Sequence, residues 1–125
     1  MIVIDSSGWI EFFADGPHAE DFASRLRHPS TILTPTIALY EVYKWIKRER
    51  SEEDALQAAA AMKRTRILDL TEDVALTAAD LSLAHGLAMA DSMMLAAARV
   101  HDAELLTTDS GFEGIEGVTV FTKKR

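Results

Sequence analysis

Residues Leu87–Asp109, LAMADSMMLAAARVHDAELLTTD, hold in one continuous stretch the pattern that decides the fold. Apolar residues recur at helical spacing after Asp91, so this part predicts a buried helix with Asp91 in its first turn. The apolar run at 104–107 predicts a short strand, and Asp109 follows where that strand ends. Each aspartate also has a purely structural interpretation, Asp91 as a helix N-cap and Asp109 as a turn former before a Ser-Gly pair.

The rest of the chain alternates predicted strands with predicted helices. Strands are expected at 2–4, 31–34, 66–70, 104–107 and 118–122. Helices are expected between 6 and 16, then at about 18–27, 36–49, 51–64 and 71–86, and from about 91 onward. This order predicts an α/β fold: a single domain over residues 1–125, with a mainly parallel five-stranded sheet and helices on both faces.

Composition narrows the class of protein. The 125 residues contain no apolar run of membrane-spanning length and no basic segment ahead of an apolar one, so we expect a cytoplasmic protein without a membrane span. The absence of cysteine excludes disulfides and thiolate metal sites. The net charge of −7 argues against non-specific nucleic-acid binding through a basic face.

Acidic residues fall where the predicted strands end. In parallel sheets the active crevice lies beyond the carboxyl ends of the strands, and Asp5 and Asp109 each follow a strand. If those two strands are neighbours, Asp91 joins them at one edge of the sheet. Glu41 lies among apolar residues of the helix at 36–49, where it is either a solvated side chain or a fourth member of the site.

Such a cluster suits a hard cation. Carboxylates without cysteine or histidine favour Mg²⁺ or Mn²⁺ over zinc. One ion would lower the pKa of a water molecule, and two would also stabilise the attacking and leaving oxygens of a phosphodiester. Basic residues form groups that are either solvated helix surface or contacts to a phosphate backbone: Lys44, Lys47, Arg48 and Arg50; Lys63, Arg64 and Arg66; and Lys123, Lys124 and Arg125.

Four segments, in order, resemble the PIN-domain ribonucleases, specifically the VapC-type toxins of prokaryotic toxin–antitoxin pairs: IVIDSSGWIEFF, ALYEVYKW, LAMADSMMLAAA and LLTTDSGFEG. The resemblance implies that four acids bind the metal and carry catalysis, and that two hydroxyl residues hold those acids in place. The acids are Asp5, Glu41, Asp91 and Asp109, and the hydroxyl residues are Ser6 and Thr108. Some relatives carry a further acid two or three residues beyond the fourth, whereas here Glu113 is one step late, which puts a second metal in doubt.

The expected function is therefore a metal-dependent endoribonuclease that acts as a toxin. The resemblance also implies an RNA substrate, a small cognate antitoxin and a homodimer. Two alternatives stay open at this point. One is a phosphatase or phosphotransfer receiver domain on a similar sheet, although Asp5 lacks the acid partner that either would need. The other is a non-catalytic binding module that retains the acids.

Overall fold

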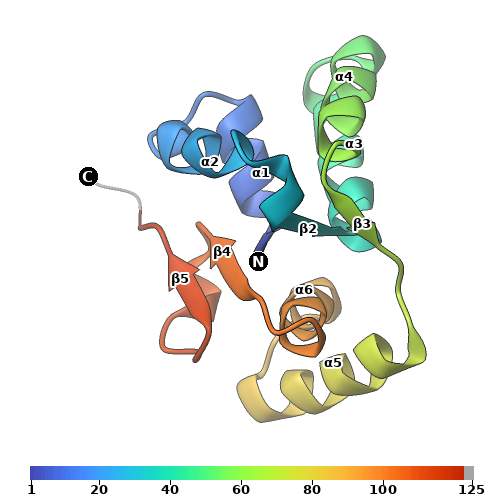
Figure 1. Ribbon diagram of the computed structural model, residues 1–125, viewed down its shortest axis with the longest axis vertical. Coiled ribbons are helices and arrows are strands. Elements are labelled where there is room, and N and C mark those ends of the chain that lie inside the picture. Colours follow the sequence, from blue (N-terminus) through green and yellow to red (C-terminus); the bar gives the residue numbers. More distant parts are fainter. Residues whose placement is uncertain (123–125) are drawn as a thin grey trace.

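The computed structural model describes residues 1–122 and shows a five-stranded sheet with helices on both faces (Figure 1). The basic tail Lys123–Arg125, considered above as a phosphate contact, lies outside the described residues. The strands are β1 Ile2–Ile4, β2 Ile32–Pro35, β3 Arg66–Leu68, β4 Glu104–Thr107 and β5 Val118–Val120. The helices are α1 Ser6–Phe13, α2 Ala19–Leu26, α3 Thr36–Glu49, α4 Glu52–Met62, α5 Glu72–His85 and α6 Met89–Val100. Short 3-10 turns cover Pro29–Thr31 and Ser110–Phe112.

The sheet has the order β3-β2-β1-β4-β5, and every pair of neighbouring strands is parallel. The strand β1 is central, and Ile4 stands opposite Leu106 of β4. The N–H of Asp5 continues this pairing by donating to the Leu106 carbonyl at 2.9 Å. The first and fourth strands are thus neighbours, which is the condition stated above for a shared acidic edge, and both strands end at the same edge of the sheet.

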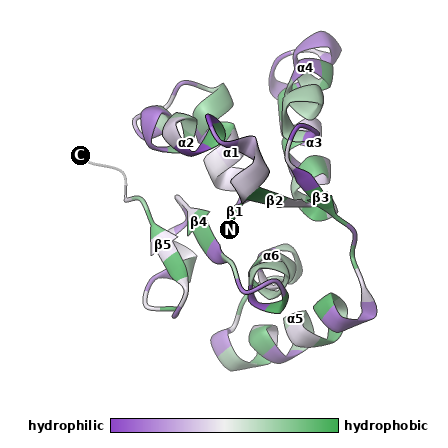
Figure 2. Cartoon of the chain, in the orientation of Figure 1, coloured by the Kyte–Doolittle hydropathy of each residue, from purple (hydrophilic) through white to green (hydrophobic). Residues whose placement is uncertain are grey.

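Two layers of helices enclose the sheet. In Figure 1, α5 and α6 lie on one side, whereas α1 and α2 lie on the other with the α3–α4 pair beside them. Hydrophobic residues are concentrated on β2, β4 and β5 (Figure 2). The largest buried side chains, Trp9, Phe22 and Phe112, fill the space between sheet and helices. Gly8 allows the tight approach of α1 to α2, because a Cβ there would lie 2.5 Å from Phe22 Cε1.

Local signals fixed several helix ends as expected. Thr71 caps α5 by accepting the Val74 N–H at 3.2 Å, and Ser51 caps α4 in the same way. Gly86 ends α5 in the left-handed conformation with φ of 69°. Asp5 is the N-cap of α1, and Ser6 is already the first helical residue.

No single helix among residues 1–122 is long and apolar enough to cross a membrane. The bent pair of α5 and α6 meets the requirement together, by length and composition only.

Candidate active site

Four acidic side chains reach the edge of the sheet where β1 and β4 end, each from a different element. Asp5 follows β1, Asp109 follows β4, Asp91 lies in the first turn of α6, and Glu41 lies in the second turn of α3. The negative charges of Asp5, Asp109 and Glu41 all raise the pKa of Asp91, as expected of carboxylates that share one cleft. The structure therefore brings together all four acids that the sequence singled out.

Asp5 is the most deeply placed of the four, with only 3% of its surface exposed. Its Oδ2 accepts hydrogen bonds from Thr107 Oγ1 at 2.8 Å and from Ser7 Oγ at 2.9 Å. Burial raises the pKa of the Asp5 carboxyl, the two hydroxyl hydrogen bonds oppose the shift, and the charge of Glu41 adds to it. The pKa of Asp5 is raised overall, because burial destabilises the charged carboxylate more than the hydrogen bonds from neutral donors stabilise it.

The two hydroxyls that hold Asp5 also fix the backbone at the end of β4. The Asp109 N–H donates to Thr107 Oγ1 at 3.0 Å, and the Thr108 N–H donates to Ser7 Oγ at 3.1 Å. Each hydroxyl thus donates to the carboxylate and accepts from a peptide group, which fixes its rotamer. The sequence interpretation gave the supporting role to Thr108, whereas the structure places the Thr107 hydroxyl on Asp5 and involves Thr108 through its N–H.

Sequence reasoning missed both Ser7 and Thr107. Strand alternation gave no signal, because β4 is covered on both faces and Leu105, Leu106 and Thr107 are all buried; the one available signal was a hydroxyl residue in an otherwise apolar strand. A buried hydroxyl beside a predicted site needs a polar partner, and the nearest predicted one was the carboxylate of Asp5.

Glu41 is held by the other serine. Ser6 Oγ donates to Glu41 Oε1 at 2.6 Å, a contact that joins α1 to α3 across 35 residues of sequence. The side chain is half-buried, so it is not the freely solvated glutamate of the alternative interpretation. The hydrogen bond instead directs Glu41 toward the cleft that Asp5 lines.

Asp91 is not an N-cap. Helix α6 begins at Met89 with Ala88 as its N-cap, so Asp91 is already the third helical residue. Burial is the largest cause of the rise of its pKa to about 6, and the charges of Asp5, Asp109 and Glu41 follow in that order. A carboxyl with this pKa is partly protonated near neutral pH unless a positive charge offsets its neighbours.

Asp109 fits both of its interpretations. Its Oδ1 accepts the Gly111 N–H at 2.8 Å and caps the 3-10 turn Ser110–Phe112, which is the predicted turn role. Its charge also raises the pKa of Asp91, which puts the same carboxylate in the acidic cleft. The turn hydrogen bond orients a side chain that the cleft uses.

The four acids offer only oxygen ligands to a metal ion. Asp5 is buried and the other three are half-buried, and such a set of carboxylates matches the chemistry of Mg²⁺ or Mn²⁺. Within residues 1–122, however, no three acidic or histidine side chains are grouped closely enough to form a finished metal site. The residues thus fit a hard divalent cation by type and charge, and the carboxylates would have to draw together around it.

Comparison with known proteins places this arrangement in a family. The family model of the PIN domain matches residues 2–118. No curated protein matches the chain in sequence. Among solved structures, a toxin–antitoxin complex from Klebsiella pneumoniae is similar with a TM-score of 0.82 and 24% identity, over 96% of this chain and 97% of that one.

Two further structures share the fold. VapC20 of Mycobacterium tuberculosis, a sarcin–ricin loop cleaving toxin, has a TM-score of 0.72 and 20% identity over 90% of this chain and 92% of its own. FitAcB from Neisseria gonorrhoeae has a TM-score of 0.74 and 22% identity over 98% and 97% of the two chains. With the family model matching nearly the whole chain and the acidic cleft at the expected edge of the sheet, this protein belongs to the PIN domain family.

Proposed function

We propose that this protein is a metal-dependent endoribonuclease and the toxin of a toxin–antitoxin pair. The observation that carries the proposal is the convergence of Asp5, Glu41 and Asp109 on Asp91, whose pKa burial and these three charges together raise to about 6. Such a cleft is costly for the folded protein and serves a purpose only if it binds positive charge. The similarity to a Klebsiella pneumoniae toxin–antitoxin complex and to an RNA-loop-cleaving toxin supports the same conclusion.

The four acids have different roles, which follow from their positions. Asp5, rigidly held by Ser7 and Thr107, is the principal ligand for Mg²⁺ or Mn²⁺, and Asp91 and Asp109 complete the negative face. When bound, the ion supplies positive charge that acidifies a water molecule and stabilises the developing charge on the phosphate. Glu41, oriented by Ser6, is the residue placed to position a water or to take up its proton.

A ribonuclease that degrades cellular RNA has to be restrained in its own cell. The solved structures that this chain resembles include toxin–antitoxin complexes, some of them bound to DNA. We therefore expect a small cognate antitoxin, and a homodimer of the toxin, as for the resemblance stated above. The family match leaves the phosphatase and receiver alternatives without support. The non-catalytic alternative differs from the proposal in one measurable property, RNA hydrolysis.

The test is cleavage of a labelled RNA by the purified protein, with Mg²⁺, with Mn²⁺ and with EDTA. We expect hydrolysis with either cation, none with EDTA, and a loss of at least about 100-fold in Asp5→Asn and Asp91→Asn. Arg27→Gln, an exposed change at the C-cap of α2, is the control and should cleave normally. Full activity in a folded Asp5→Asn protein would refute the assignment. Absence of cleavage in every preparation, with no cation binding, would favour the non-catalytic module.

A further inference from the structure

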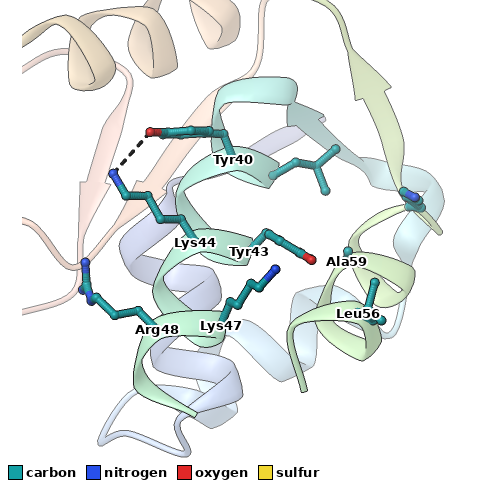
Figure 3. Close-up of a pocket in the computed structure, with 9 residues that line it drawn as sticks. Tyr40, Tyr43, Lys44, Lys47, Arg48, Leu56 and Ala59 are labelled. Carbon is teal, nitrogen blue, oxygen red and sulfur yellow. Dashed lines mark hydrogen bonds between the residues drawn. The ribbon is translucent and has the colours of Figure 1, made fainter. Parts of the chain in front are cut away.

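A groove of about 670 Å³ is lined by α3, α4 and the start of the following loop, and the chemistry described above does not use it (Figure 3). Its floor is aliphatic and aromatic, and its rim is basic. The residues that line it are Leu39, Tyr40, Tyr43, Lys44, Lys47, Arg48, Leu56, Ala59 and Lys63. The groove and the acidic cleft share α3, where Tyr40 of the groove is followed by Glu41 of the cleft.

The aromatic rings of this groove are open to a flat ligand. Tyr40 is 59% exposed, which leaves a large aromatic ring in water on a helix whose other large apolar residues are buried or half-buried. Lys44 Nζ lies 5.3 Å from the centre of the Tyr40 ring and 3.2 Å from its hydroxyl, and Lys47 Nζ lies 5.6 Å from the Tyr43 ring. Figure 3 shows Tyr40, Lys44 and Arg48 in a row along α3. Each ring therefore stands beside a cation.

The charge of the groove is opposite to that of the molecule. The whole chain carries a net charge of −7, yet four of its thirteen lysines and arginines line this one groove, and no acid does. Lys47 pairs with Glu52 at 3.2 Å and Arg48 with Glu49 at 3.0 Å, both across exposed surface where an ion pair is weak and easily exchanged. A polyanion can replace Glu52 and Glu49 as the partner of Lys47 and Arg48. A second copy of this acidic chain would gain less from contact with the same two cations.

We propose that the α3–α4 groove binds a single-stranded segment of the RNA substrate, with bases stacked on Tyr40 and Tyr43 and phosphates on Lys44, Lys47 and Lys63. The combination of stacking rings with a line of cations is the general chemistry of single-strand binding, and it tolerates any sequence. Arg48 follows Tyr40 by eight positions, so the two residues lie about 12 Å apart along the axis of α3. An RNA lying along it arrives at Glu41 and hence at the acidic cleft. This inference rests on the proposed function.

The experiment measures binding separately from cleavage. The probe is a fluorescein-labelled, 2′-O-methylated RNA 12-mer, which resists hydrolysis, and the readout is fluorescence anisotropy at several salt concentrations. We expect Tyr40→Ala to weaken binding about tenfold, since loss of one stacked base costs roughly that factor. The conservative Tyr40→Phe should recover most of the loss because the ring remains. Lys44→Gln with Lys47→Gln should lower the slope of log affinity against log salt by about 1.4, or about 0.7 for each phosphate contact.

Controls separate the groove from the catalytic site and from other interfaces. Arg27→Gln removes one exposed cation at the C-cap of α2, which does not line the groove, and should bind as wild type does. Thermal melts establish that each variant is folded. Unchanged affinity in Tyr40→Ala and in the double lysine variant would overturn the proposal even if the protein cleaves RNA. If these variants lose RNA binding but the wild-type protein does not cleave RNA, the RNA-binding role of the groove stands and the proposed nuclease activity is refuted. If Tyr40→Ala instead dissociates a dimer and leaves RNA affinity intact, the groove is an interface between copies and the proposal is wrong.

Discussion

Asp91→Asn should stabilise the metal-free protein at neutral pH, although it removes a residue proposed to be essential. The pKa of Asp91 rises from 3.8 to about 6 on folding, which corresponds to about 3 kcal/mol at about 1.4 kcal/mol per pKa unit. Asp91 is only half-buried, so solvent screening reduces this to about 1.5 kcal/mol. The substitution also removes a favourable interaction between the Asp91 charge and the dipole of α6, which costs about 0.5 kcal/mol of stability. The net gain is about 1 kcal/mol, or roughly 4 °C in Tm for a chain of this size.

The pH dependence follows from the direction of the shift. A carboxyl whose pKa is raised in the folded state binds more protons when folded, so its ionisation destabilises the fold as pH rises from about 4 to about 6. Above pH 6 the penalty is complete, and below pH 4 it has vanished. The advantage of Asp91→Asn should therefore be full at pH 7.5 and close to zero at pH 4.

The assay is a thermal melt in EDTA at both pH values. The matched control is Asp80→Asn, which neutralises an exposed acid on α5 outside the cleft and should change stability by less than about 0.5 kcal/mol. If Asp91→Asn melts at or below wild type at pH 7.5, burial and the neighbouring charges do not destabilise ionised Asp91 as the structure implies. An equal gain at both pH values would place the effect in helix propensity rather than charge.

Three other outcomes are expected. Thr107→Val keeps the shape of a fully buried residue but removes the hydroxyl on Asp5, so it should cost about 1–3 kcal/mol in urea unfolding and lower the rate of RNA cleavage at least tenfold. Gly8→Ala should cost a similar amount of stability without touching the acids, because its Cβ would overlap the Phe22 ring at 2.5 Å; a normal Tm would show that α1 and α2 can move apart. Excess Mg²⁺ should raise the Tm of wild type and raise that of Asp5→Asn much less, and equal increments in the two proteins would remove Asp5 from the metal site.

Much of the fold followed from local patterns. Short apolar runs ending in acids identified β1 and β4, and the alternation of strands with helices predicted the parallel sheet with helices on both faces. The four acids could be selected because strand ends in such a sheet share an edge. The beginning of α6 was placed two residues late, since Ala88 and Met89 carry no N-cap signal and the extended backbone of Ala88 alone marks the boundary.

The supporting hydroxyls were harder to predict, for a physical reason. Whether Thr107 or Thr108 faces Asp5 depends on which side of β4 packs against α1, and that is set by contacts between segments about 100 residues apart. A shift by one residue reverses the side of the sheet to which a strand residue points. Likewise the α3–α4 groove exists only because two helices pack side by side, so the sequence showed its lysines as a charged group and not as a site.

The central position of β1 has a consequence for the order in which the protein becomes active during synthesis. The strand β1 must wait for β4, about 100 residues later in the chain, before its second edge is paired. Until then Asp5 lacks the Thr107 hydroxyl, Asp109 is not yet made, and the cleft holds at most three of its acids. Pairing between distant segments also forms late in folding, because its loop-closure entropy has to be overcome first. On the proposed function, a chain that stops before β4 is therefore expected to lack nuclease activity, because its cleft is incomplete.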